Sequence, residues 1–198
     1  MSGNGAGSLK PLPESNLYVV LIHFPVKNKK GLPIGSALTT IDMHDIARAS
    51  ITFGVKGFYV VTPYEDQAVL AGQVIDHWTK GVGGTLNPFR KSALELIRVT
   101  RTFEEAVIGM EEERKEPVVT IGTSAAAIPG SITTDMLRQK LENRVSHALV
   151  FGTAWGLADE LLDTCDYTLA PIFGKTGYNH LSVRSAVSIY LDRITNGR

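Results

Sequence analysis

Short apolar runs alternate along this chain with longer stretches in which apolar residues recur every three or four positions. The runs have the length of buried strands, and the stretches between them have the period of amphipathic helices. Strands are predicted over residues 17–24, 57–62, 96–99, 117–121, 149–151 and 167–170. Helices are predicted over residues 40–53, 64–78, 90–94, 103–114, 135–142 and 180–194. This alternation predicts an α/β fold, with a mainly parallel sheet and helices on both faces.

The first residues of the chain have a different composition from the rest. Residues 1–16 are rich in glycine, serine and proline and contain almost no large apolar side chain. A segment of this kind cannot bury enough apolar surface to order itself, so we expect residues 1–16 to be a disordered N-terminal extension. The remainder, 17–198, has the length of a single domain. Glycine-rich stretches inside it, such as residues 81–84, are predicted to be turns.

Composition narrows the class of protein. Of the 198 residues, 43% are hydrophobic and 20% are charged, as in a globular protein, and the formal net charge is zero. Zero net charge argues against a large positively charged surface for nucleic acid, although a local basic patch can still bind it. The candidate basic residues are Arg48, Lys175 and Arg184, and two separate clusters are formed by Lys27, Lys29 and Lys30, and by Arg90, Lys91, Arg98 and Arg101.

Cys165 is the single cysteine, which excludes an internal disulfide and fits the reducing cytoplasm. No apolar run approaches the roughly 20 residues of a membrane span. The chain also lacks a charged-then-apolar leader, so we expect a cytoplasmic protein. The five histidines have no metal-ligand spacing, and neither a phosphate loop nor a dinucleotide glycine motif is present.

The most informative stretch is residues 149–191. One apolar run ends at Phe151-Gly152, and the turn that follows closes with Gly156-Leu157. A second run ends at Ala170-Pro171-Ile172, and a loop then leads to a helix that begins near His180. Loops at the carboxyl ends of parallel strands are where open α/β sheets bind ligands. Glycine at such a turn allows the backbone to approach a ligand closely.

The order of these motifs resembles the cofactor-binding half of the SPOUT class of knotted RNA methyltransferases. That class has an apolar strand followed by Gly-x-Glu-Gly-x-Gly-Leu, then a strand ending in Ile-Pro, then Ser-Leu-Asn-Val-Ser-Val-Ala. The present chain matches the last motif with residues 180–186, which read His-Leu-Ser-Val-Arg-Ser-Ala. The family glutamate is absent, the glycine turn is one residue shorter, and Ser182 replaces the usual asparagine.

A second resemblance lies in the first helix. Residues 42–57 are similar to the N-terminal family motif Asn-x-Gly-x-x-x-Arg-x-Ala-x-x-Phe-Gly-x-x-Gly, with Arg48, Phe53 and Gly54 in register. Asp42 replaces the asparagine and His44 the glycine. In the family branch that methylates ribose 2′-hydroxyls, this arginine belongs to the active site. A ribose hydroxyl is a poor nucleophile, and a nearby cation stabilises the alkoxide that it must form. The planar guanidinium of arginine also fits phosphate oxygens.

The resemblance implies S-adenosylmethionine (AdoMet) as cofactor, RNA (tRNA or rRNA) as substrate, a homodimer and a C-terminal deep trefoil knot. Within the family, the partner completes each active site, so the first and last helices are expected at the dimer interface. The implied catalytic residues are Arg48, Asp42 and His44. The implied cofactor-binding residues are Thr123, Ser124, Phe151, Gly152, Thr153, Gly156, Leu157, Pro171, Ile172, Tyr178, Asn179, His180, Leu181 and Ser182.

Alternatives remain open at this point. Ribose 2′-O methylation fits the Arg48 motif best, but transfer to a base nitrogen is possible, with Asp42, Asp45 or Asp159 as proton acceptor. The missing glutamate and the neutral charge favour a second reading, a non-catalytic knotted module that binds RNA or nucleotides. A third reading is an unrelated doubly wound nucleotide-binding enzyme, which an unknotted C-terminus would indicate.

Overall fold

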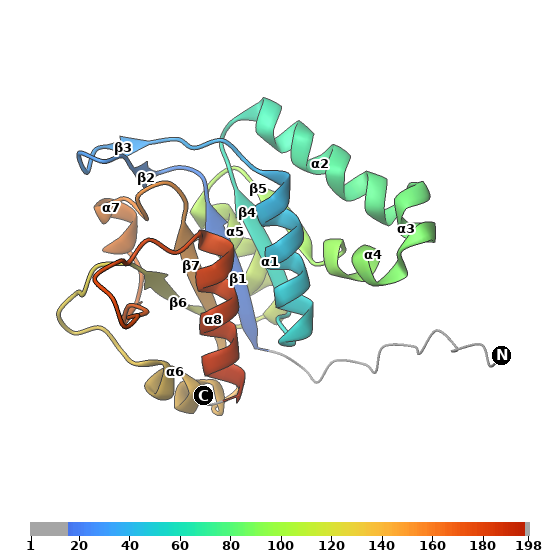
Figure 1. Cartoon of the computed structure of the whole chain (residues 1–198). Helices are drawn as coiled ribbons and strands as arrows, with labels where there is room; N and C mark the ends of the chain where they lie inside the picture. The colour runs from blue at the N-terminus through green and yellow to red at the C-terminus, as the bar shows by residue number, and fades with distance from the viewer. Residues whose placement is uncertain (1–15, 197–198) are drawn as a thin grey trace.

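A sheet of six parallel strands lies at the centre of the protein, and a computed structural model describes residues 16–196 (Figure 1). The strand order is β5-β4-β1-β7-β6-β8. The strands span Leu17–Ile22 (β1), Gly57–Val61 (β4), Ile97–Thr100 (β5), Val118–Thr123 (β6), Ser146–Gly152 (β7) and Tyr167–Leu169 (β8). Leu21 of β1 is in register with Val60 and Phe151 on its two sides. Because the strands are parallel, their carboxyl ends meet at one end of the sheet.

Helices cover both faces of this sheet. Those on the first face are α1 (Thr40–Thr52), α2 (Glu65–Thr79), α4 (Pro88–Leu94), α6 (Thr134–Leu141) and α8 (Val183–Asn196). Those on the second face are α5 (Phe103–Arg114) and α7 (Asp159–Leu162). In Figure 1, α1 and α8 lie side by side in front of the sheet and α5 lies behind it.

The alternation of side chains along β1 explains the two layers. Val19 and Leu21 belong to the core beneath α1 and α8, whereas Tyr18 and Val20 belong to the core beneath α5. Every residue of β1 is buried, as expected for a strand with helices on both of its faces. The predicted α/β architecture with a parallel sheet is therefore confirmed, including the helices on both faces.

The structure also contains elements that the apolar pattern did not predict. The predicted turn at residues 81–84 is a short helix, α3 (Val82–Leu86), which packs against α2 and α4. A Cβ at Gly84 would lie 2.4 Å from the carbonyl oxygen of Trp78, so glycine is what permits this close packing. Between β1 and α1, the strands β2 (Val26–Lys27) and β3 (Pro33–Ile34) form an antiparallel hairpin where a loop was expected.

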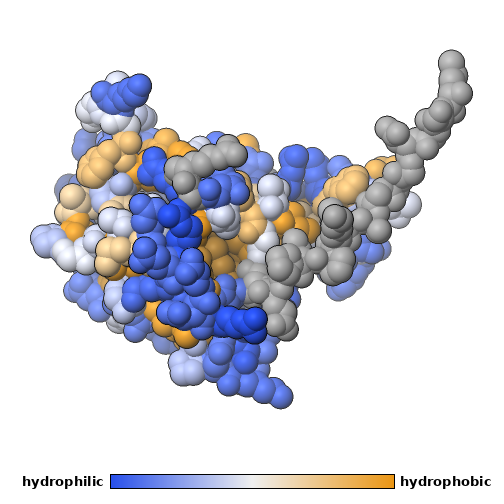
Figure 2. Space-filling view, turned by 90° about the horizontal axis from the view of Figure 1, so that it is seen from below, coloured by the Kyte–Doolittle hydropathy of each residue, from blue (hydrophilic) through white to orange (hydrophobic). Residues whose placement is uncertain are grey.

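The prediction of disorder for residues 1–16 falls mostly outside the described residues, which begin at Asn16. The Asn16 side chain donates hydrogen bonds to the carbonyl oxygens of Leu141 and Val145. Seen from below, at the end where β1 begins, the described surface is mainly hydrophilic, with apolar residues in scattered patches (Figure 2). Within residues 16–196, no helix combines the length and apolar character that crossing a membrane requires.

Candidate active site

Loops that follow four of the strands surround a cavity of about 700 Å³ at the carboxyl end of the sheet. Small-molecule sites typically enclose roughly 300–1,000 Å³, so a cofactor fits within this volume. The structure brings most of the predicted site residues into its lining. These are Asp42, Thr123, Ser124, Phe151, Gly152, Thr153, Gly156, Ile172, Asn179, His180, Leu181 and Ser182.

The turn after β7 forms one wall of the cavity, and it depends on glycine. A Cβ at Gly152 would lie 2.3 Å from the Leu157 amide nitrogen and 2.5 Å from the Gly156 carbonyl carbon. Gly156 has a φ of +97°, a conformation that residues with a Cβ rarely adopt. The amide of Gly156 closes the turn by donating to the carbonyl of Thr153 at 2.9 Å. The backbone therefore passes through a space that a side chain at Gly152 would fill.

A buried histidine and two hydroxyl groups fix the base of this turn. His23 follows β1 and is only 1% exposed. Its Nδ1 lies 3.0 Å from Ser36 Oγ, which in turn lies 2.5 Å from Thr153 Oγ1. Burial lowers the pKa of His23, although the charge of Asp42 acts in the opposite direction. This network joins the ends of β1 and β7 to the segment that precedes α1.

The opposite wall comes from the ends of β6 and β8 and from the loop that precedes α8. Thr123 donates to the Val150 carbonyl at 2.9 Å, which holds the end of β6 beside β7. Asn179 donates through Nδ2 to the Ala125 carbonyl at 2.6 Å, which fastens the long loop to the end of β6. Ile172, Phe151 and Leu181 give this part of the cavity an apolar surface.

Asp42 and Arg184 place opposite charges side by side in the cavity wall. Arg184 Nη1 lies 3.0 Å from Asp42 Oδ1, and Arg184 Nε lies 3.5 Å from Asp45 Oδ2. The second oxygen of Asp42 accepts a hydrogen bond of 2.5 Å from the Thr39 hydroxyl. The Asp42 side chain is 11% exposed and the Arg184 side chain 35%. The cavity thus presents a carboxylate, a guanidinium, several hydroxyl groups and an apolar surface.

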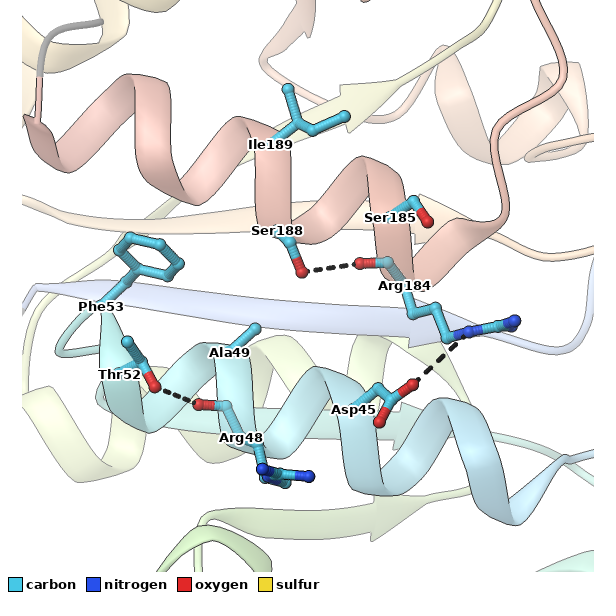
Figure 3. A pocket seen from close by; sticks show the side chains of 9 residues that line it. All are labelled: Asp45, Arg48, Ala49, Thr52, Phe53, Arg184, Ser185, Ser188 and Ile189. Carbon is cyan, nitrogen blue, oxygen red and sulfur yellow. Dashed lines mark hydrogen bonds and ion pairs between the residues drawn. The ribbon is translucent and has the colours of Figure 1, made fainter.

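Arg48, predicted as a catalytic residue, does not line the loop cavity of its own chain. It lines a second hollow of about 580 Å³ between α1 and α8, together with Phe53, Ser188 and Ile189. In Figure 3 the Arg48 side chain projects from α1 away from α8, whereas Arg184 extends from α8 toward Asp45. Arg184 lines both hollows, so it is the guanidinium that reaches the loop cavity.

The remaining predicted residues also lie outside the lining of the loop cavity. The His44 ring contacts Trp78, with ring centroids 5.6 Å apart, and burial and Arg90 lower its pKa. Leu157 is 2% exposed and belongs to the core on the α5 face. Pro171 is buried beside Ile172, while Tyr178 is 71% exposed and its ring contacts that of His180.

Several lining residues were absent from the sequence-based set. They are Ser36, Ala37, Thr39, Ala125, Ala154, Trp155, Val183, Arg184, Ala186 and Tyr190. Ser36 and Ala37 belong to the crossover from β3 to α1, and no family motif covers them. Arg184 is inside the matched motif of residues 180–186, where the family has a serine, and it was predicted as a basic residue that could contact RNA, not as part of the cofactor cavity.

A family model described as SAM-dependent RNA methyltransferase matches residues 16–196. One similar protein is the tRNA (guanine-N(1)-)-methyltransferase of Oleidesulfovibrio alaskensis, which is 43% identical over 182 residues. The alignment covers 92% of this chain but 42% of that protein, so the chain spans less than half of its length. An uncharacterized protein of Aquifex aeolicus is 36% identical over 180 residues, which are 90% of this chain and 88% of that protein.

The fold is also similar to solved structures. One is the SpoU methyltransferase AviRb from Streptomyces viridochromogenes in complex with AdoMet, with a TM-score of 0.55 and 17% identity. That similarity covers 94% of this chain and 60% of the other. A methylase family protein from Neisseria gonorrhoeae has a TM-score of 0.63 at 19% identity, covering 95% and 86% of the two chains. At these identities the similarity concerns the fold.

Proposed function

Because the chain belongs to the family of SAM-dependent RNA methyltransferases, we propose that it transfers a methyl group from AdoMet to RNA. The observation that carries this proposal is the cavity at the carboxyl end of the sheet. Its walls are a glycine turn that a single Cβ would obstruct and an ion pair between Asp42 and Arg184. We further propose that residues 17–198 act as one AdoMet-binding domain, in the cytoplasm, where the substrate is found.

The residues of the cavity fit the chemical groups of AdoMet. Phe151, Ile172 and Leu181 provide an apolar surface for the adenine ring, while main-chain groups of the turn at residues 152–156 are available to adenosine. Arg184 suits the carboxylate of the amino acid portion. When bound, AdoMet supplies a methyl group made electrophilic by its sulfonium.

For the acceptor we propose a base nitrogen in tRNA, with guanine N1 first. The prediction of a ribose 2′-hydroxyl depended on Arg48, which lines the other hollow. The relative from Oleidesulfovibrio alaskensis carries the name of a guanine-N1 enzyme. Guanine N1 must lose its proton as the new N–C bond forms, and we propose the Asp42 carboxylate in the cavity wall as the proton acceptor.

The second candidate acceptor is the ribose 2′-hydroxyl, supported by the match of Arg48, Phe53 and Gly54 to the family motif. We propose that this role needs a homodimer in which α1 and α8 pair with a second chain. Phe53, Ala49 and Ile189 give the hollow between these helices an apolar floor that a partner can cover, with Arg48 at its edge. Arg48 would then face the partner's cavity.

We also propose the C-terminal trefoil knot. Two contacts support it. The Asn179 side chain donates a hydrogen bond to the Ala125 carbonyl. The Ile132 amide donates to the Thr168 carbonyl, and the Ile132 carbonyl accepts from the Ala170 amide. The segments after β6 and β8 therefore lie against each other where the family threads its chain. An experimental structure in which residues 171–182 pass outside the loop that follows β6 would contradict the knot.

The experiment that tests the function is transfer of a labelled methyl group from AdoMet to total tRNA, followed by mass spectrometry of the nucleosides. We expect 1-methylguanosine with the unaltered chain, and loss of at least about 100-fold with Asp42→Asn, the range of general acid–base effects. The matched control is Asp45→Asn, on the same helix but lining the other hollow. A 2′-O-methylnucleoside would instead select the ribose acceptor. Binding of AdoMet without transfer to any RNA would select a non-catalytic module.

A further inference from the structure

Three aromatic rings gather at the mouth of the loop cavity, contributed by two separate loops. Trp155 belongs to the turn after β7, and its ring centroid lies 5.9 Å from that of His180, in the loop that precedes α8. The Tyr178 ring lies 5.5 Å from His180. Both contacts are edge-to-face. Trp155 and His180 also line the cavity, so this aromatic rim borders the place where the chemistry is proposed.

The rim is exposed, although aromatic side chains of this size are normally among the more buried ones. Trp155 is 54% exposed and Tyr178 is 71% exposed. The turn that presents Trp155 has a conformation that residues with a Cβ rarely adopt, because Ala154 has a φ of 51°.

The lysine-containing hairpin of β2 and β3 is hydrogen-bonded directly to the turn that carries Trp155. The Trp155 amide donates to the Lys27 carbonyl at 3.1 Å, and the Lys27 amide donates to the Gly156 carbonyl at 2.8 Å. The Lys27 ammonium pairs with Asp159 at 2.7 Å. Lys29 and Lys30 lie at the exposed tip of the hairpin, and neither forms an ion pair within residues 16–196. The hairpin that carries Lys29 and Lys30 is therefore attached to the turn that carries Trp155.

We propose that Trp155, with Tyr178 and His180, stacks an unpaired RNA base at the cavity mouth, while Lys29 and Lys30 contact the adjoining phosphates. The inference rests on the proposed function and assigns its substrate surface. Sequence-specific and single-strand RNA sites combine aromatic platforms for bases with cations along the backbone, and both are present here. It also moves His180 and Tyr178, which were predicted to bind the cofactor, to the RNA side of the site.

The first test uses the fluorescence of Trp155. The chain contains two tryptophans, so Trp78→Phe leaves Trp155 as the single reporter. We expect a single-stranded RNA hexanucleotide to quench this emission saturably, and an abasic hexamer with the same phosphates to leave it unchanged. The reverse variant, Trp155→Phe, reports on Trp78 and should show no quenching. Quenching by AdoMet alone, with none by RNA, would assign the rim to the cofactor and overturn the proposal.

The second test separates stacking from charge. Trp155→Ala should weaken RNA binding on the order of 10-fold, and Trp155→Phe should restore most of it, since base stacking requires an aromatic face. Lys29→Ala with Lys30→Ala should lower the salt dependence of RNA binding by about two phosphate contacts. Phe173→Ala is the matched control, because Phe173 lies in the loop that carries Tyr178 and His180, is 67% exposed and lies outside the cavity lining.

These tests remain independent of the methyl transfer. AdoMet affinity should stay within about 2-fold of the unaltered chain in Tyr178→Ala, because Tyr178 belongs to the rim but lies outside the cavity lining. If the unaltered chain fails to bind AdoMet, the proposed function fails while the RNA fluorescence result stands. If Trp155→Ala binds RNA as tightly as Phe173→Ala does, the stacking proposal fails while the proposed function stands.

Discussion

Arg184 at the start of α8 and Asp42 in the first turn of α1 form an ion pair of 3.0 Å across 142 residues of sequence. The pair connects the two helices where they border the loop cavity, and Arg184 also reaches Asp45 at 3.5 Å. Asp42 is in turn fixed by Thr39, the residue that caps α1. The Asp42 carboxylate therefore accepts a hydrogen bond from the residue that caps α1, pairs with α8 and lines the cavity.

Replacing Arg184 tests this relationship. Arg184→Ala leaves the 11%-exposed Asp42 carboxylate without its cation, and a charged hydrogen bond of this kind contributes about 1.5–3 kcal/mol. Since Arg184 is partly exposed, we expect a loss near ~1.5 kcal/mol, or roughly 3–6 °C in Tm. Thermal melting followed by circular dichroism measures it. Asp45→Asn removes only the longer contact and should shift Tm by less; equal shifts would contradict a special role for Asp42.

Gly152→Ala probes the turn after β7. The new methyl group would meet two backbone atoms at 2.3 and 2.5 Å, which cannot move without opening the turn. We expect a destabilisation of about 1–3 kcal/mol, together with loss of AdoMet binding. Gly174→Ala is a suitable control, because no atom lies within 4 Å of a Cβ at that position. Urea unfolding curves for the two variants should differ, and identical curves would mean that the turn tolerates a side chain.

The stability of the protein should depend on pH through His23. Burial lowers the pKa of His23 in the folded chain below its ordinary value of 6.5. Below about pH 6.5 the unfolded chain therefore takes up a proton that the folded chain does not. Stability should fall as the pH drops through this range, by up to about 1.4 kcal/mol per pH unit for one histidine. Above pH 7 the contribution is constant.

The measurement is the free energy of unfolding between pH 5 and pH 7.5 for the unaltered chain and for His23→Asn. His147 has a pKa that burial also lowers, so the variant should keep part of the acid sensitivity. If the free energy of unfolding changed with pH equally in His23→Asn and in the unaltered chain, protonation of His23 would not destabilise the folded protein.

Arg48→Ala distinguishes the two hollows. Since Arg48 lines the hollow between α1 and α8 and not the loop cavity, its loss should leave AdoMet affinity within about 2-fold, whereas Arg184→Ala should weaken it about 10-fold. Calorimetric titrations of both variants make the comparison. Weakening of AdoMet binding by Arg48→Ala alone would show that Arg48, and not Arg184, contacts the cofactor. Ile189→Glu should in addition dissociate the proposed dimer, as sedimentation would show.

Much of the fold could be predicted because buried strands and helices have characteristic patterns of apolar residues in the sequence. The runs at residues 17–24 and 57–62 correspond to β1 and β4, and the helix predicted at 103–114 is α5 with the same bounds. The hairpin of β2 and β3 could not be predicted this way. Its strands have two residues each, and its register is set by contact with the turn after β7, far along the chain.

The position of the cavity could be predicted, but not which charged side chains line it. Glycine and proline mark the turns at Gly152, Gly156 and Pro171, and parallel strands bring these turns to one end of the sheet. Which guanidinium faces the cavity depends on how α1 and α8 are rotated against each other. A motif fixes the position of Arg48 in the sequence but not that rotation, and the structure selects Arg184.

The most direct test of the central claim is a calorimetric titration of the unaltered chain with AdoMet. We expect saturable binding with a Kd in the micromolar range, lost in Gly152→Ala and retained in Gly174→Ala. Absence of binding by the unaltered chain, or equal binding by both glycine variants, would contradict the claim that the loop cavity holds the cofactor.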